Sequence, residues 1–430
     1  MRYDIPYGDR KVGFEAPEES VIFKGEMSNI PPLKDLKDAL VSSLESPLGT
    51  PPLKDLARGK KNIVFLVEDS TRRTPLDIIM PLITGYLEEN GVPDDAMSFL
   101  TAPGTHRIMT DREILEKLGP EMVRRFKVVQ HDATVAEDMV DIGTVMAGDY
   151  KIPAHVNRYA LASDLLVGVG NIVPHCDAGY AGGAKILQPG VCGFVTTSAT
   201  HAAAGFCPDI PLGVADGNPC REGIEGVARI AGLAFIVNIV KNYQGEIAGV
   251  FSGDFIRAHR EGIKLAERSF RISVPQPADI VVVSSWPSDM DYWQATKGVS
   301  CAYFAVKKGG VIIFAAPCEE GLAHNHPLFK EWLSLSLDEA LRKLRAASPE
   351  DVEADMVSAV LSICNCRARE KAKIFSVTEG LTEEDIAAMQ YTPFPTVQEA
   401  LDMALELIPG ATIGIIPMGG ISLPIIGRSQ

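Results

Sequence analysis

The residues best suited to chemistry are concentrated in residues 171–190, which read NIVPHCDAGYAGGAKILQPG. This stretch carries an imidazole at His175, a carboxylate at Asp177 and an amine at Lys185, with glycines between them. Because glycine lacks a Cβ and adopts positive φ, such a loop lets the backbone approach a ligand closely. An amine beside the loop either binds phosphate or acts as a nucleophile. We therefore predict a binding loop in which Lys185 has one of these two roles.

Three other loops combine polar and basic residues: EDSTRRTP (68–75), APGTHR (102–107) and DYWQATKG (291–298). Each loop alone is a weak signal, because short motifs often occur by chance. All of them follow predicted strands, and the carboxyl ends of strands in an open α/β sheet gather in one crevice. Their shared position predicts one common site.

Two arginines, Arg72 and Arg73, precede a predicted helix at residues 75–90. Cations at the amino end of a helix oppose its dipole. An anion bound between the arginines and the helix would remove this conflict. We predict that Arg72 or Arg73 holds a substrate carboxylate or a phosphate.

Histidines on two of the loops, His106 and His175, are the predicted acid/base groups, because imidazole titrates near neutrality. Two bases in one cleft suit racemisation or epimerisation, in which the mirror-image substrates present their proton from opposite sides. His201 is either a third base or a metal ligand. Lys185 and His201 do not form a metal site alone, since zinc or nickel requires two further donors. The pair in AHNHP, His324 and His326, is expected to be solvent-exposed.

The elements that must position these groups alternate as in an α/β fold. Strands are predicted at 61–67, 97–101, 126–130 and 165–169, with helices at 75–90, 110–118 and 196–204. A hairpin at 235–240 and 247–252 and a helix at 254–269 follow. After a proline-containing boundary near residue 272, a second set begins with a strand at 279–283, a loop at 284–298 and a helix at 301–307. A strand at 310–315, helices at 330–347 and 351–372, and strands at 373–377 and 411–416 complete the second set.

The length of 430 residues is typical of two domains. We predict an N-terminal cofactor-binding α/β domain, 1–272, to which the chain returns at about 395–430. A C-terminal α/β domain, 273–394, is predicted to face it across the active-site cleft.

Composition excludes several classes of protein. A formal net charge of −15 argues against binding to nucleic acid, which needs clustered cations. No apolar run is long enough for a transmembrane helix, and the N-terminus lacks an apolar signal core, so a cytoplasmic enzyme without a membrane partner is expected. The eight cysteines form no CxxC pair and are predicted to be buried free thiols.

The combination of motifs resembles the nickel-pincer-dependent lactate racemase family. The resemblance is carried by EDSTRRTP, APGTHR, HCDAGYAGGAKILQPG, His201 and the pair Gln294 and Lys297, and it extends over residues 60–300. The glycine- and lysine-containing stretch is its most specific element. The two-domain layout with a C-terminal return is also similar to that family.

The resemblance implies a cofactor. Family members use a nickel-pincer nucleotide, a pyridinium-3-thioamide-5-thiocarboxylic acid mononucleotide that holds nickel through one carbon and two sulfurs. Lys185 matches the lysine that tethers it covalently, and His201 matches the protein's nickel ligand in a square-planar site. Asp69 and Thr71 match positions near the cofactor, as do Gly182 and Gly183.

The resemblance also implies a reaction on a 2-hydroxy acid. His106 and His175 match the two acid/base histidines, and Arg72 matches the arginine that binds the substrate carboxylate, with Gln294 and Lys297 as its partners. The implied chemistry is reversible hydride transfer through a 2-keto acid. Cofactor-synthesis enzymes are the implied protein partners.

One position departs from the family pattern. Lactate-acting members carry a tyrosine directly before the glutamine, where this chain has Trp293, preceded by Tyr292. Both aromatic residues are predicted to contact substrate, and packing between domains is the alternative for Trp293. An aromatic, longer-chain, dicarboxylic or sugar-acid 2-hydroxy acid is therefore open as substrate.

Two other functions compete with the racemase or epimerase. One is a nucleotide-dependent oxidoreductase, although GYAGG is not the GxGxxG fingerprint. The other is a non-catalytic carrier of the cofactor, which would not need two acid/base histidines. Assembly into a homo-oligomer is left open by the sequence.

Overall fold

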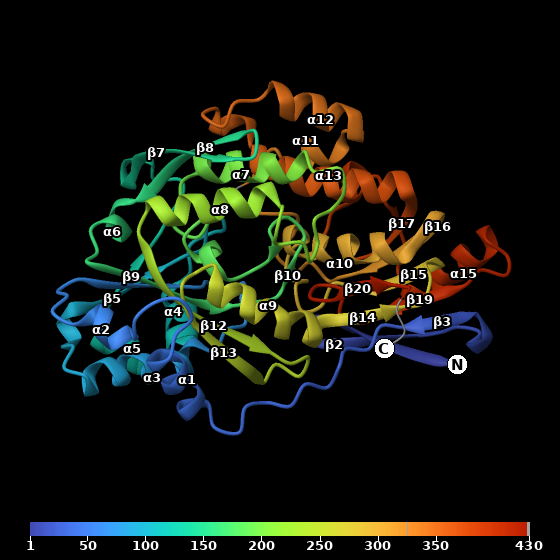
Figure 1. Cartoon of the computed structure of the whole chain (residues 1–430). Helices are drawn as coiled ribbons and strands as arrows, with labels where there is room; N and C mark the ends of the chain where they lie inside the picture. The colour runs from blue at the N-terminus through green and yellow to red at the C-terminus, as the bar shows by residue number, and fades with distance from the viewer. Residues whose placement is uncertain (325, 428–430) are drawn as a thin grey trace.

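Two six-stranded sheets, each covered by helices, form the framework of the chain (Figure 1). The computed structural model describes residues 1–324 and 326–427. In the first sheet β12 pairs in parallel with β9, and only β13 is antiparallel to its neighbour. Its strand order is β13 (Ile247–Gly253), β12 (Leu233–Lys241), β9 (Leu165–Asn171), β4 (Ile63–Val67), β5 (Met97–Thr101) and β6 (Lys127–Gln130).

Every pair of neighbours in the second sheet is parallel. Its strand order is β18 (Thr392–Pro393), β17 (Ala372–Val377), β16 (Val306–Ala315), β15 (Ala278–Ser284), β19 (Ile413–Ile416) and β3 (Val21–Lys24). Four two-stranded ribbons accompany the sheets: β1 (Arg2–Tyr7) with β2 (Arg10–Glu15), β7 (Met139–Ala147) with β8 (Tyr150–Asn157), β10 (Pro174–His175) with β11 (Gly179–Tyr180), and β14 (Arg271–Val274) with β20 (Leu423–Ile426).

The helices of the first half are α1 (Leu36–Glu45), α2 (Leu53–Ala57), α3 (Leu76–Glu89), α4 (Asp111–Leu118), α5 (Pro120–Arg125), α6 (Arg158–Leu161), α7 (Phe194–Gly205), α8 (Pro219–Ile230) and α9 (Arg257–Phe270). Those of the second half are α10 (Tyr292–Ala305), α11 (Phe329–Ser334), α12 (Leu337–Ala346), α13 (Met356–Lys371), α14 (Glu383–Met389) and α15 (Val397–Leu407).

Local sequence explains the elements that carry the site. The strand β4 reads IVFLV and is buried along its whole length, as expected of a central parallel strand covered on both faces. The predicted strand at 97–101 is confirmed with the same bounds. The helix α4 begins after Thr110, which forms the predicted capping box with Glu113. An α/β fold built of two sheets is thus confirmed.

The predicted domain division requires a correction. The strands β3 and β19 both belong to the second sheet, although they lie within the ranges assigned to the first domain, 1–272 and 395–430. The hairpin β1–β2 also packs against the second sheet, where Ile5 and Phe14 share a core with Ile280. These long-range contacts join distant parts of the chain, so they could not be read from local patterns. Residues 428–430 of the predicted return lie outside the described residues.

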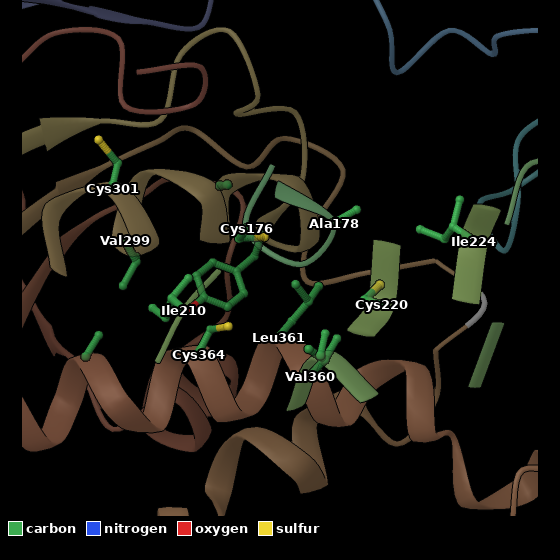
Figure 2. Close-up of a cluster of buried hydrophobic side chains, with 14 of the residues drawn as sticks. Cys176, Ala178, Ile210, Cys220, Ile224, Val299, Cys301, Val360, Leu361 and Cys364 are labelled. Atoms are coloured by element: carbon green, nitrogen blue, oxygen red, sulfur yellow. The ribbon is translucent and has the colours of Figure 1, made fainter. Parts of the chain in front are cut away.

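One hydrophobic cluster contains buried residues from both halves of the molecule and so joins them. Figure 2 shows part of it: Cys176 and Ala178 lie near Cys364 and Leu361 of α13, with Val299 of α10 close by. The helix α13 also packs against α7. All eight cysteines are free thiols and seven are buried, which confirms their predicted state. Across residues 1–324 and 326–427, none of the helices combines the length and the apolar character needed to cross a membrane.

Candidate active site

A cavity between the two halves is lined by residues from all four predicted loops. The strands β9, β4 and β5 are adjacent and parallel, so the loops after them meet at one edge of the first sheet. The helix α10, which follows β15 of the second sheet, covers the cavity from the other side. The prediction that these loops converge is confirmed.

The segment 291–298 is helical, so its predicted loop is corrected. The carboxylate of Asp291 accepts the backbone N–H of Gln294 at 2.7 Å and starts α10 at residue 292. Such caps contribute about 1 kcal/mol to helix stability. Residues three apart lie on one helical face, and Lys297 Nζ accordingly donates to Gln294 Oε1 at 2.6 Å.

The same helix turns Tyr292 away from the cavity, which corrects its predicted contact with substrate. The Tyr292 ring is 0% exposed, and its hydroxyl bonds to the Tyr391 hydroxyl at 2.9 Å and accepts the Asn365 side-chain amide at 2.6 Å. Tyr292 belongs to the core of the C-terminal half. The next residue, Trp293, does line the cavity.

His106 is held between a carboxylate and an amide. Its Nδ1 lies 2.8 Å from Asp69 Oδ2, and its Nε2 lies 3.2 Å from Gln294 Nε2. Since the carboxylate accepts and the amide nitrogen donates, Nδ1 carries the proton and Nε2 keeps its lone pair. Burial opposes the charge of Asp69, but His106, Arg72 and the Thr71 hydroxyl together lower the pKa of Asp69 to about 2. Asp69 therefore stays ionised beside His106.

Thr71 supports this arrangement from outside the cavity. Its hydroxyl donates to Asp69 Oδ1 at 2.7 Å and accepts Arg72 Nη1 at 3.0 Å. Thr71 lies between the carboxylate and the arginine, and we assign it to positioning these two groups.

His175 has a different environment. It is 8% exposed, and its Nδ1 accepts the backbone N–H of Asp177 at 3.2 Å. The Asp177 carboxylate is farther away, with Oδ2 at 3.7 Å from Nδ1. Burial, followed by the charges of Lys185 and Lys297, lowers the pKa of His175 well below its usual value. The ring is therefore neutral, and its proton is on Nε2.

Two cations face the cavity around Gln294. Arg72 Nη1 and Lys297 Nζ both donate to Gln294 Oε1, at 3.3 and 2.6 Å. Within the described part of the chain, neither cation forms an ion pair with a carboxylate. Burial and the charge of Arg72 lower the pKa of Lys297 to about 7. A neutral amide cannot balance two cations, so the arrangement is suited to an anionic ligand.

Lys185 and His201 lie on the same cavity. In the described structure the Lys185 amine has neither a hydrogen bond nor an ion pair, and burial and the charge of Arg72 lower its pKa to about 8. His201 Nδ1 donates to the Thr197 carbonyl at 2.8 Å. Among the described residues Nε2 has no hydrogen-bond partner, so its lone pair is available to a metal ion. Burial and the Lys185 charge lower the pKa of His201 to about 3, so the ring is neutral.

Gly182 and Gly183, both predicted to bind cofactor, pack closely against other parts of the protein. A Cβ on Gly182 would lie 2.7 Å from the Asn171 carbonyl oxygen, and one on Gly183 would lie 2.8 Å from the ring of His259. Both have positive φ, 79° and 61°. Gly182 still borders the cavity, whereas Gly183 faces inward and its N–H donates to Asn238 Oδ1 at 2.7 Å.

Sequence reasoning missed the group that holds this loop. Arg221 of α8 is 0% exposed and donates to the carbonyls of Ala178, Tyr180 and Gly182. Its only sequence signal was an arginine on the apolar face of an amphipathic helix. Burial lowers its pKa to about 10, and it stays charged because carbonyl oxygens surround it.

The prediction that His324 and His326 are both solvent-exposed is wrong for His326. The side chain of His324 is 41% exposed, but His326 is buried. His326 bonds to Asp355 and stacks on Trp293, contacts that join segments distant in sequence.

The chain matches two family models over most of its length. Residues 7–210 match the lactate racemase N-terminal domain, and residues 274–425 match the lactate racemase C-terminal domain. The chain is 32% identical to lactate racemase of Thermoanaerobacterium thermosaccharolyticum over 429 residues, 97% of each protein. It is also 32% identical to lactate racemase of Lactiplantibacillus plantarum over 324 residues, 74% of this chain and 75% of the relative.

Solved structures agree with these matches. The lactate racemase apoprotein of T. thermosaccharolyticum superposes with a TM-score of 0.87 at 31% identity, covering 99% of this chain and 100% of that one. A Thermotoga maritima protein shares the fold with a TM-score of 0.71 at 22% identity, covering 91% of this chain and 98% of that one. Similarity over the whole length, in sequence and in structure, shows that the chain belongs to the lactate racemase family and is an isomerase.

Proposed function

We propose that this isomerase inverts C2 of a 2-hydroxy acid by reversible hydride transfer, through a 2-keto acid, with a lysine-tethered nickel-pincer nucleotide. The observation that carries the proposal is the shared cavity. It is lined by three histidines, His106, His175 and His201, by two cations that have no carboxylate partner among the described residues, and by the Lys185 amine. Each component has a role in this chemistry, whereas neither a nucleotide-dependent oxidoreductase nor a cofactor carrier would need all of them.

The residues of the cavity fit the cofactor. Lys185 offers a poorly solvated amine, and a lowered pKa makes an amine a better nucleophile for covalent attachment. His201 offers a neutral imidazole whose Nδ1–H is fixed by a carbonyl, the usual arrangement of a metal-binding histidine. Lys185 would hold the nucleotide and His201 would hold nickel. Once bound, this group supplies the hydride acceptor that the amino acids of the chain lack.

We assign the binding of the substrate carboxylate to Arg72 and Lys297. A carboxylate that displaces Gln294 Oε1 from these cations would restore charge balance in the cavity. The Gln294 amide would then remain free to orient the substrate beside His106. Holding the carboxylate while the carbonyl end turns keeps the reacting carbon in place, and such positioning supplies much of enzymatic rate.

We assign the two proton transfers to His106 and His175. In one direction His106 takes the hydroxyl proton on Nε2, and the Asp69 carboxylate stabilises the imidazolium that forms. The bound carboxylate offsets the charge of Lys297, one of the causes of the low pKa of His175. His175 would therefore be the imidazolium in the complex and would deliver its Nε2 proton when the opposite face of the keto acid is reduced. The roles exchange in the other direction.

The test uses protein produced together with the cofactor-synthesis enzymes, which we propose as its partners. Intact-mass measurement is expected to show an adduct on Lys185, metal analysis to show nickel, and chiral chromatography to show interconversion of 2-hydroxy acid enantiomers. Lys185→Ala should lose the adduct and the activity while it remains folded. Adduct and nickel without interconversion of any 2-hydroxy acid would support a carrier instead. Absence of both adduct and nickel would overturn the assigned cofactor.

A further inference from the structure

His326 is a buried histidine that the proposed chemistry does not use. It is 6% exposed and lies between β16 and α11, in the C-terminal half. Its two ring nitrogens and one ring face each contact a different segment of the chain. A polar ring that is buried with every group engaged usually specifies one arrangement of the segments around it.

One nitrogen is anchored to a rigid position. His326 Nδ1 lies 3.0 Å from Asp355 Oδ1, and the other carboxylate oxygen accepts the Ser358 hydroxyl at 2.6 Å. Asp355 is left-handed, with φ 46° and ψ 52°, directly before α13. A non-glycine residue in this region is strained and persists where its surroundings hold it in place. Because Asp355 accepts, Nδ1 of His326 carries the proton and Nε2 is an acceptor.

The other nitrogen reaches across to the first half of the molecule. His326 Nε2 lies 3.3 Å from the Thr105 hydroxyl, which donates to it. Thr105 directly precedes His106, and the neighbouring Gly104 N–H donates to the Gly190 carbonyl at 3.0 Å. The loop that carries His106 is therefore tied to the glycine-lysine loop on one side and to His326 on the other.

The ring face of His326 supports the cavity wall. Its centroid lies 3.8 Å from that of Trp293 with the rings 9° from parallel, and Phe194 of α7 meets its edge at 6.1 Å. Trp293 precedes Gln294, which contacts His106 Nε2. His326 thus contacts the loop that precedes His106, through Thr105, and the helix α10 that faces it, through Trp293.

We propose that Asp355, His326 and Thr105 form an interdomain latch in which His326 is a positioning residue for the acid/base group His106. The latch joins the two halves beside the cavity, and it sets the distance between the His106 loop and α10. The inference rests on the proposed function for the catalytic role of His106, whereas the latch itself rests on the contacts alone.

The first test compares matched variants in cofactor-loaded protein. Thr105→Val keeps the shape and removes the hydroxyl, and His326→Phe keeps an aromatic face for Trp293 and removes both hydrogen bonds. Each is expected to lower kcat about tenfold, because small displacements of a catalytic group are costly. KM should change less than about twofold, since Arg72 and Lys297 are untouched. Thr105→Ser should retain wild-type kcat.

Glu320→Gln is the control across the same interface. Glu320 pairs with Arg107 at 3.5 Å on a partly exposed surface, where ion pairs contribute little. It should therefore leave kcat unchanged. Wild-type kcat in both Thr105→Val and His326→Phe would overturn the proposal. So would a loss in Thr105→Ser equal to that in Thr105→Val, because packing of the methyl group would then be responsible.

The second test does not depend on activity. Hydrogen–deuterium exchange of the amides in residues 102–107 should be faster in Thr105→Val than in wild type, and unchanged in Thr105→Ser and Glu320→Gln. Equal exchange in all four proteins would overturn the latch. If wild-type protein carried cofactor but racemised no 2-hydroxy acid, the proposed function would fail while the exchange measurement still decided the latch.

Discussion

The two histidines that we propose as acid/base groups, His106 and His175, lie in different electrostatic surroundings. His106 has an ionised carboxylate at 2.8 Å and keeps its lone pair on Nε2. The Nδ1 of His175 accepts a backbone N–H, the Asp177 carboxylate oxygen is 3.7 Å away, and the positive charges of Lys185 and Lys297 act on the ring. Interconversion of two enantiomers is the same reaction in both directions, yet the two histidines proposed to catalyse it have different surroundings. The difference indicates that one ring is supported by the protein and that the other depends on the bound anion.

The largest expected effect comes from removing either ring. His106→Asn and His175→Asn should each lower kcat by roughly 10³-fold, within the range for general acid–base groups. Racemisation needs both proton transfers, so the double variant should be little slower than either single one. Chiral chromatography of the product from each pure enantiomer provides the measurement. Near-normal activity in one single variant would contradict the two-base assignment.

The second prediction compares the loss of the carboxylate near each histidine, Asp69 near His106 and Asp177 near His175. Asp69→Asn should lower kcat about 10²-fold, since a comparable change beside a catalytic histidine costs more than this. Asp177→Asn should have an effect below about threefold, because the backbone N–H that contacts His175 remains. Steady-state kinetics of both variants, loaded equally with cofactor, test this difference. Equal losses would mean that the histidines are supported alike.

The third prediction concerns pH and the cation beside His175. Lys297 has a pKa of about 7, so its charge is present below this pH and is lost above it. If the charged form binds the carboxylate, kcat/KM should fall by up to about tenfold per pH unit above pH 7. Lys297→Arg keeps its charge at high pH and should flatten the profile between pH 6 and about 9. An unchanged profile in Lys297→Arg would assign the titration to another group.

The smallest expected effect on activity is that of Tyr292→Phe. The lost hydroxyl bonds to Tyr391 and Asn365 in the core, not to the cavity. Chemical denaturation should show a loss of about 1–2 kcal/mol in the free energy of unfolding, typical of a buried hydrogen bond whose partner is left unsatisfied. Values of kcat and KM should match those of the wild type. A raised KM would indicate that Tyr292 contacts the substrate, as predicted from the sequence.

Local patterns were sufficient for most individual elements. The apolar run before EDSTRRTP predicted β4, and the Thr110 and Glu113 pair predicted the start of α4. The start of one helix was misplaced, because α10 begins at residue 292 and the predicted helix began at residue 301. The first turns of α10 combine aromatic, polar and apolar residues without a clear period, because this helix is buried on nearly all sides. Its cap, Asp291, was the one available signal.

The sequence by itself determined which groups are available for catalysis: the histidines, the arginine, the lysines and the order of the loops that carry them. Residue type and position after a strand were enough for this, because parallel strands bring their carboxyl ends together. Only the tertiary structure decided that Tyr292 faces the core, that Gly183 packs on His259, and that His326 bridges the two halves. These outcomes depend on contacts between residues far apart in the chain, and no local pattern encodes such contacts.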